Sequence, residues 1–179
     1  MMKNTFNIFK KAAVLFAVAL GLNSCLEKIP GDYILEEDTM NTVADAEQIL
    51  TGIYSAYMSG ALFSGYLTLC PDIQADLVYA VNGNTNTYGN IWQWDIRSTS
   101  SEIEAVYASL YTVIGRCNFF LDKVAALRES LTDDDSIETL DFYTGEVYCA
   151  RALAYSELIK CFCKAYDPAT AETDLGVVL

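Results

Sequence analysis

Residues 101–130 read SEIEAVYASLYTVIGRCNFFLDKVAALRES, and they constrain the architecture more strongly than any other segment. Their apolar residues recur at steps of three and four, the spacing that gathers side chains on one face of an α-helix. Ser101 and Glu104 have the spacing of a capping box at its start. At about 1.5 Å per residue the helix is roughly 45 Å long, so it needs a partner along its apolar face. That face comprises Ile103, Val106, Tyr107, Leu110, Ile114, Cys117, Leu121, Val124 and Leu127.

The partner helix is expected immediately downstream. Residues 137–166 carry a second helical stripe, and the acidic break at 132–136 places carboxylates where a helix N-terminus favours negative charge. A short connection between two long amphipathic helices predicts an antiparallel hairpin. Asp167 and Pro168 end the second helix, and the apolar run at 174–179 is expected to be exposed and strand-like. The second stripe comprises Ile137, Leu140, Val147, Tyr148, Tyr155, Leu158, Ile159 and Phe162.

Another helix is predicted before the hairpin. Thr42 and Asp45 give a capping signal at its start, and one apolar stripe runs from there to about Met58. The stripe comprises Val43, Ala46, Leu50, Ile53 and Tyr57.

The segment at 60–98 reads as largely irregular. A short helix is expected from Pro71 through Tyr79, and the asparagine- and glycine-rich tract at 82–90 predicts a loop. The predicted fold class is therefore mainly α, with helical hairpins and an irregular loop region rich in aromatic and asparagine residues.

The first 24 residues have the pattern of an export signal. Three lysines accompany an apolar run at 12–22, which covers about half of a ~30 Å hydrocarbon core and is too short for a transmembrane helix. Leu22-Asn23-Ser24-Cys25 resembles a lipobox, in which a peptidase cuts before a cysteine that carries diacylglycerol, although Asn23 replaces the usual small residue. Cys25 is the predicted lipidation site, and an ordinary secretory signal with a chance cysteine is the alternative. The predicted organisation is a signal peptide at 1–24, a lipidated arm at 25–41 and a helical domain at 42–179.

Charge and composition exclude several function classes. Eleven basic residues stand against 24 acidic ones, with a net charge of −13, so a basic surface for nucleic acid is not expected. The absence of histidine excludes Ser-His-Asp and Cys-His catalysis and removes the commonest metal ligand. No motif fixes the paired carboxylates of a glycosidase. We therefore expect no enzyme, no cofactor and no metal.

Five cysteines follow Cys25, an odd number that cannot all pair internally. We interpret them as buried thiols acting as small apolar side chains, with a disulfide or a metal site as the alternative. Arg151 lies in a small-residue segment, where a buried guanidinium needs a partner. We expect Glu146, Asp122 or a helix-end carbonyl, with an anion-binding arginine as the alternative. The five cysteines are Cys70, Cys117, Cys149, Cys161 and Cys163.

Several motifs, in this order, resemble the N-terminal part of SusD/RagB-family outer-membrane lipoproteins. The strongest are Tyr107-x-x-Leu110-Tyr111-x-x-Ile114-x-x-Cys117-Asn118 and Gly145-Glu146-x-x-x-x-Arg151-Ala152-Leu153-Ala154-Tyr155-x-x-Leu158. The lipobox, Thr51-Gly52-Ile53-Tyr54, Tyr166-Asp167-Pro168 and Asp174-Leu175-Gly176-Val177 add to the resemblance. The family usually has Gly near Cys163 and Pro at Val178, and its members continue beyond Leu179, so the chain resembles a truncated form. Asn118, Glu146 and Arg151 are expected to be structural motif residues.

The resemblance implies a scaffold of tetratricopeptide-like hairpins, anchored by lipid at the surface of the outer membrane of a Gram-negative bacterium. It implies capture of a nutrient oligosaccharide or polysaccharide and delivery to a SusC-like TonB-dependent barrel. A different function class stays open, namely a helical protein-interaction lipoprotein that serves as a transporter lid or scaffold for uptake of a non-carbohydrate nutrient.

The candidate ligand-binding residues lie between 82 and 94. Sugar recognition uses flat aromatic faces together with amides that donate to and accept from hydroxyls. The two tryptophans are not both expected to bind ligand. Residues two apart in such a pair often face opposite sides of an extended segment, so one of them is expected to pack into the domain. The candidate platforms are Tyr88, Trp92 and Trp94, and the candidate hydrogen-bonding residues are Asn84 and Asn86.

Overall fold

The computed structural model describes residues 39–79 and 81–179. The predicted signal peptide at 1–24, Cys25 and the arm as far as residue 38 lie outside the described residues. In the part that is described, every regular element is a helix, which confirms the predicted mainly α class. The helices are α2 (Val43–Tyr57), α3 (Tyr66–Gln74), α4 (Gly89–Trp92), α5 (Ser101–Ser130) and α6 (Asp134–Phe162).

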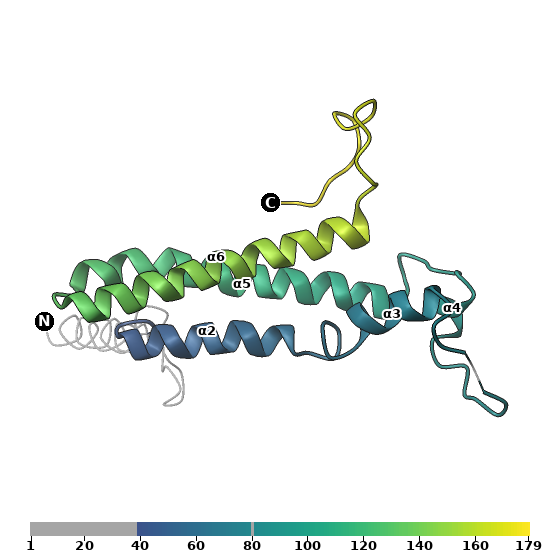
Figure 1. Ribbon diagram of the computed structural model, residues 1–179, viewed down its shortest axis with the longest axis horizontal. Coiled ribbons are helices and arrows are strands. Elements are labelled where there is room, and N and C mark those ends of the chain that lie inside the picture. Colours follow the sequence, from purple (N-terminus) through teal and green to yellow (C-terminus); the bar gives the residue numbers. More distant parts are fainter. Residues whose placement is uncertain (1–38, 80) are drawn as a thin grey trace, which may run out of the picture. The chain divides into compact units, whose positions relative to one another are not determined.

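The two long helices α5 and α6 form the predicted antiparallel hairpin (Figure 1). Contacts along its length pair early residues of one helix with late residues of the other: Arg128 with Asp141, Asn118 with Arg151, and Tyr107 with Phe162. The Asp133 side chain caps α6 by accepting from the Ser136 amide at 2.9 Å. The acidic break therefore begins the helix, as its charges indicated, three residues before the first apolar position of the stripe.

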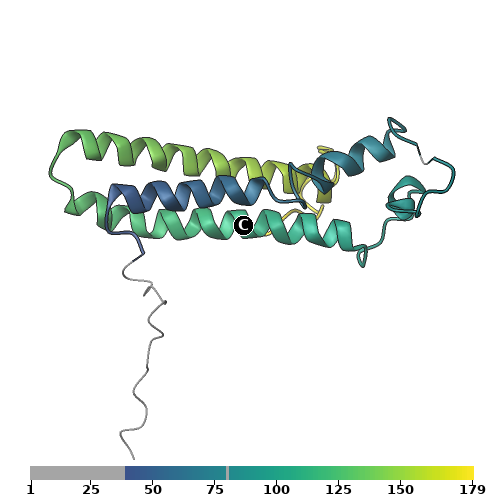
Figure 2. The same ribbon diagram turned by 90° about the horizontal axis from the view of Figure 1, so that it is seen from below.

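Helix α2 packs against both helices of the hairpin, parallel to α6 and antiparallel to α5 (Figure 2). Its N-terminus carries the predicted capping box, in which the Asp45 amide donates to Thr42 Oγ1 and the Thr42 amide donates to Asp45 Oδ2. The Arg116 guanidinium on α5 donates to the backbone carbonyl of Gly52. The three-helix arrangement is thus fixed by packing and by a few side-chain bonds between helices.

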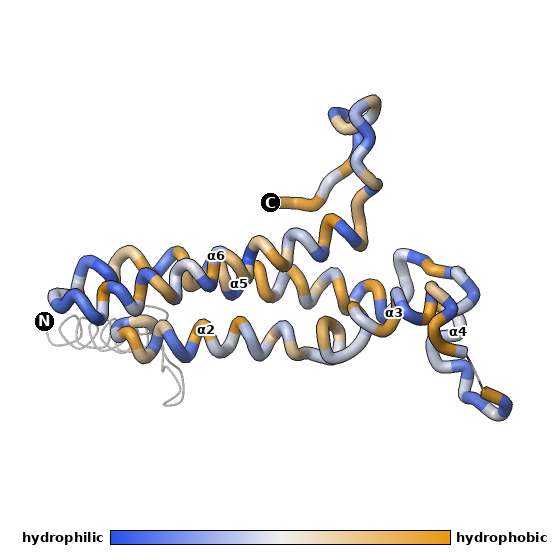
Figure 3. Tube along the Cα trace, viewed as in Figure 1, coloured by the Kyte–Doolittle hydropathy of each residue, from blue (hydrophilic) through white to orange (hydrophobic). Residues whose placement is uncertain are grey.

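The main core runs between these three helices. Apolar residues recur along each of them (Figure 3), and no charged or polar side chain is buried among the described residues. Completely buried residues include Ile53 on α2, Leu110 and Phe120 on α5, and Leu140 and Leu158 on α6. Because each helix buries one stripe, the hydrophobic effect selects this packing over isolated helices.

A second, smaller core supports the irregular region. Cys70 and Ile73 of α3 and Ile91 of α4 are buried together, with Tyr66 and Tyr88 packed partly against them. Helix α3 also contacts the beginning of α5. This small core joins the 76–94 segment to the hairpin without a long regular element.

Three helices differ from prediction at their ends. Helix α3 begins at Tyr66 rather than at Pro71, which lies inside it, because burial of the helix's apolar face outweighs the helix-breaking tendency of proline. The helix ends at Gln74 rather than at Tyr79. The predicted capping box at the start of α5 does not form, because the N-cap residue is Ser100 and it makes no side-chain cap bond. Helix α6 ends at Phe162, where Cys163 turns to extended backbone, before Asp167 is reached.

The C-terminal segment is not a strand in the structure. Leu175 and Leu179 are exposed, as expected of the apolar run, but the Tyr111 hydroxyl donates to the Val178 carbonyl at 2.9 Å and Val177 packs against the main core. The Lys164 ammonium pairs with Asp174 at 2.6 Å. The segment is therefore held against the helices at defined points.

The prediction that the five cysteines are buried is confirmed for only two of them. Cys70 and Cys117 are buried, and burial raises the pKa of Cys117 to about 11, but Cys149 and Cys161 are exposed and Cys163 is intermediate. All five are free thiols. In the described part of the chain, each helix lacks either the length or the apolar composition that crossing a bilayer requires.

Candidate functional site

A cavity of about 460 Å³ lies beside the second core. It gathers Asn84, Asn86, Tyr88 and Trp92, which are four of the five residues predicted to bind ligand. Its volume falls in the ordinary range for small-molecule sites. The remaining wall residues are Leu69, Ile73, Val78, Tyr79, Thr87 and Gly89.

The aromatic walls are supported from behind. The Tyr88 ring is half-buried and meets the ring of Tyr66 edge-on, with centroids 6.0 Å apart. Trp92 is the last residue of α4, and its amide donates to the Tyr88 carbonyl at 3.0 Å. The indole is 47% exposed, so one surface is available while its backbone is fixed. An aromatic face that is both exposed and positioned is what stacking on a sugar ring requires.

The two asparagines have different roles in the loop. Asn84 is used internally, because Nδ2 donates to the Val81 carbonyl at 2.8 Å and Oδ1 accepts from the Asn86 amide at 2.7 Å. The Asn86 side chain has no hydrogen bond within the described residues. It lies close to the backbone of Gly89, where a Cβ atom added to the glycine would be 2.2 Å from Asn86 Oδ1. Asn86 is therefore the amide that is free to bond a ligand hydroxyl, while Asn84 shapes the loop.

Trp94 is not brought to the cavity. It is 66% exposed and does not line the walls. The expectation that one tryptophan packs into the domain is wrong, because the segment forms a helical turn rather than an extended strand. Ile91 fills the core position instead, at 1% exposure.

Two cavity-lining residues, Asn86 and Tyr88, have unusual backbone conformations. Among the described residues, the non-glycine residues with positive φ are Asp76, Asn86, Tyr88 and Trp94, with φ between 57° and 60°. Asparagine adopts this region readily, whereas bulky aromatic residues do so at a cost. Such conformations are found disproportionately at binding sites, where surrounding contacts hold them.

Electrostatically the cavity is neutral. No charged side chain lines it within the described residues, and the nearest part of the sequence, 66–100, contains three acids and one base, Arg97. Arg97 is paired with Asp95 through two bonds of 3.0 Å. The polar groups available to a ligand are thus amides, hydroxyls and an indole N–H.

The sequence did not single out several wall residues. Leu69 and Ile73 belong to α3, Tyr79 precedes the 82–90 tract, and Thr87 lies within that tract. The one available signal was Tyr79, an aromatic residue in an irregular segment, which is 84% exposed.

The three predicted motif residues lie on the hairpin, away from this cavity. The Arg151 guanidinium donates to Asn118 Oδ1 at 2.9 Å and lies 5.4 Å from the Tyr148 ring centroid, so its partner is an amide rather than the expected acid or carbonyl. Glu146 instead accepts from the Tyr54 hydroxyl on α2. That bond raises the pKa of Tyr54 to about 12, aided by partial burial.

A comparison with family models gives one match. The SusD-like model described as starch-binding and associating with the outer membrane matches residues 32–178 of the 179-residue chain. No curated protein and no solved structure matches the chain.

Proposed function

We propose that this chain, which belongs to the SusD-like family, binds a nutrient glycan in the cavity formed by Asn86, Tyr88 and Trp92. The family is associated with starch binding at the outer membrane and is generally non-catalytic. The cavity assignment, the glycan and the mode of attachment are our proposals for this chain.

One observation carries the proposal. Four of the five residues predicted to bind sugar line a single cavity, which has an exposed indole, a supported tyrosine and an unpaired amide. A pyranose ring presents C–H groups to the indole face and hydroxyls to the amide, so its two kinds of surface are matched.

The neutral walls favour a neutral glycan. A uronate or sulfate group would find no basic side chain among the wall residues. The net charge of −13 would also repel an acidic polymer.

Attachment and delivery complete the proposed role. We place the lipid on Cys25, and a thioether-linked diacylglycerol with an additional acyl chain gives stable anchoring, at about 0.8 kcal/mol per buried CH₂. A SusC-like TonB-dependent barrel is the proposed recipient of the glycan. The anchor would keep the binding domain at the outer surface of the membrane beside that barrel.

The proposal is tested by calorimetric titration of the full chain with neutral oligosaccharides, namely malto-, cello-, xylo- and mannohexaose, beside acidic hexagalacturonate. We expect binding of at least one neutral member and none of the acidic one. Asn86→Ala should weaken that binding, whereas Asn90→Ala, four residues later in α4 and not on the walls, is the matched control. Absence of binding to every oligosaccharide would contradict the proposal.

A second candidate is a protein-interaction lipoprotein, favoured by a groove of about 620 Å³ between α2 and α6. Its walls are largely apolar and include the exposed Phe142 and Leu153. Co-purification with a barrel transporter, together with no affinity for any oligosaccharide, would favour this candidate over the first.

A further inference from the structure

Another cavity, of about 520 Å³, is separate from the proposed glycan site. It opens where α3, the 96–98 segment, the beginning of α5 and the last turn of α6 meet. Its walls are mostly apolar, with Ile103 and Phe162 among them, and two basic residues, Arg97 and Lys160, also line it.

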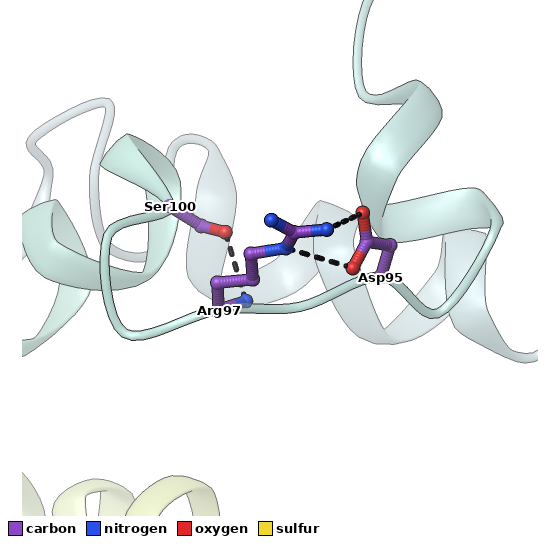
Figure 4. A network of polar contacts seen from close by, with 3 residues as sticks. All are labelled: Asp95, Arg97 and Ser100. Carbon is purple, nitrogen blue, oxygen red and sulfur yellow. Dashed lines mark hydrogen bonds and ion pairs between the residues drawn. The ribbon is translucent and has the colours of Figure 1, made fainter.

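Arg97 is held in a fixed orientation at this cavity. Its Nε and Nη2 donate to the two oxygens of Asp95, and its backbone amide donates to Ser100 Oγ at 3.1 Å (Figure 4). The third guanidinium nitrogen, Nη1, makes no hydrogen bond within the described residues. A guanidinium that is already hydrogen-bonded along one edge loses little further conformational entropy when its remaining N–H groups bind an anion.

Lys160 is arranged in a similar way. Its ammonium pairs with Glu157, three residues earlier on α6. Neither Glu157 nor Asp95 lines the cavity, and Glu102, whose charge contributes to the raised pKa of Cys70, does not line it either. Arg97 and Lys160 thus line the cavity while their paired carboxylates do not, although the charge of Glu157 adds to burial in raising the pKa of the wall thiol Cys161.

We propose that this cavity binds a small amphiphilic anion, with an apolar ring system against Ile103 and Phe162 and one anionic group at Arg97 and Lys160. A carboxylate, sulfonate or phosphate monoester has the required chemistry, since each accepts the N–H groups that the two cations offer. Binding is modest in strength, because both cations are solvent-exposed and already paired.

A cysteine in the cavity wall can report whether the cavity is occupied. Cys161 is an exposed thiol on this cavity, whereas Cys149 is an exposed thiol that lines the α2–α6 groove. A ligand in the cavity shields the first thiol from an alkylating reagent and leaves the second accessible. One protein molecule thus carries both the measurement and its control.

The test uses naphthalene-2-sulfonate and its neutral isostere naphthalene-2-sulfonamide as probes of the full chain. Calorimetry should show the sulfonate binding roughly tenfold more tightly, because only it meets the two cations with a full charge. Mass spectrometry after iodoacetamide treatment should show Cys161 alkylated several-fold more slowly in its presence, with Cys149 unchanged.

Matched variants distinguish the contact with the anionic group from nonspecific binding. Arg97→Gln should weaken sulfonate binding roughly tenfold and leave the sulfonamide unaffected. Arg128→Gln removes an arginine from another exposed pair with aspartate, at the far end of the hairpin, and should change neither. Equal affinity for the two probes, or equal protection of both thiols, overturns the proposal. The affinities and the alkylation rates are both measured on the unaltered chain, so they test the proposal even if a variant fails to fold.

Discussion

The guanidinium of Arg151 on α6 donates from Nη1 to Oδ1 of Asn118 on α5, at 2.9 Å, and so joins the two helices of the hairpin near its middle. Both side chains are partly in contact with solvent, which limits what the bond contributes. We predict that Asn118→Ala lowers the free energy of unfolding by about 1 kcal/mol.

A double-mutant cycle of Asn118→Ala with Arg151→Met, followed by urea unfolding, checks the pairing. The coupling free energy should be about 0.5 to 1 kcal/mol. The same cycle between Arg151 and Glu146 should give coupling near zero, since Glu146 is bonded to Tyr54. Stronger coupling to Glu146 than to Asn118 would show that the amide is not the partner.

Tyr54 should give the protein a pH dependence in the alkaline range. Its hydrogen bond to Glu146 raises its pKa to about 12 in the folded chain, from an ordinary value of 10.0. A raised pKa means that the folded state holds this proton more tightly, so its stabilising contribution is complete below pH 10 and is lost as the pH rises towards 12.

Tyrosinate absorbance during titration measures this directly. One component near pH 12 should disappear in Tyr54→Phe, and the variant should lose less stability than the parent over the same interval. Tyr54 ionising near its ordinary pKa, with identical alkaline stability in both chains, would contradict the bond.

Two phenylalanines provide a matched test of the core. Phe120 on α5 is completely buried, and Phe142 on α6 is 65% exposed. Phe120→Ala removes a buried ring and leaves a cavity, so the free energy of unfolding should fall by about 3 to 5 kcal/mol. Phe142→Ala should change it by no more than about 0.5 kcal/mol. Similar losses in urea unfolding of the two variants would mean that α5 and α6 do not pack on the faces described.

Cys25 is predicted to anchor the protein in the membrane. Cys25→Ala removes the only thiol at the lipobox position, so the protein should move from the membrane fraction to the soluble fraction. Cys149→Ala, which removes an exposed thiol on α6, is the control and should leave fractionation unchanged. A Cys25→Ala variant that remains in the membrane fraction would exclude lipidation as the means of attachment.

The long helices could be predicted because their stripes repeat over many turns and their burial follows the same period. Leu110, Cys117 and Leu158 are all in the predicted stripes and all completely buried. Helix α3 could not be predicted in the same way. Its nine residues contain Pro71, a residue that normally marks a helix start, and burial against Ile91, nearly twenty residues downstream, is what stabilises it.

The candidate site was predictable in composition and not in shape. Aromatic and amide residues between 82 and 94 indicated sugar chemistry, but nothing local distinguished Trp92 from Trp94 or Asn86 from Asn84. The distinction arises from the turn of helix at α4 and from the bonds that occupy Asn84, both of which depend on tertiary packing. Tyr79 joins the walls for the same reason.

Trp92 and Trp94 lie two residues apart, and both are exposed, yet only Trp92 lines the cavity. Calorimetric titration of the Trp92→Ala and Trp94→Ala chains with the tightest-binding neutral oligosaccharide compares the two positions. Trp92→Ala should weaken binding by up to roughly tenfold, and Trp94→Ala should leave it within about twofold, because a lost stacking contact is worth about 0.5 to 1.5 kcal/mol. Affinity that survives Trp92→Ala, or that is lost with Trp94→Ala instead, would place the glycan outside this cavity.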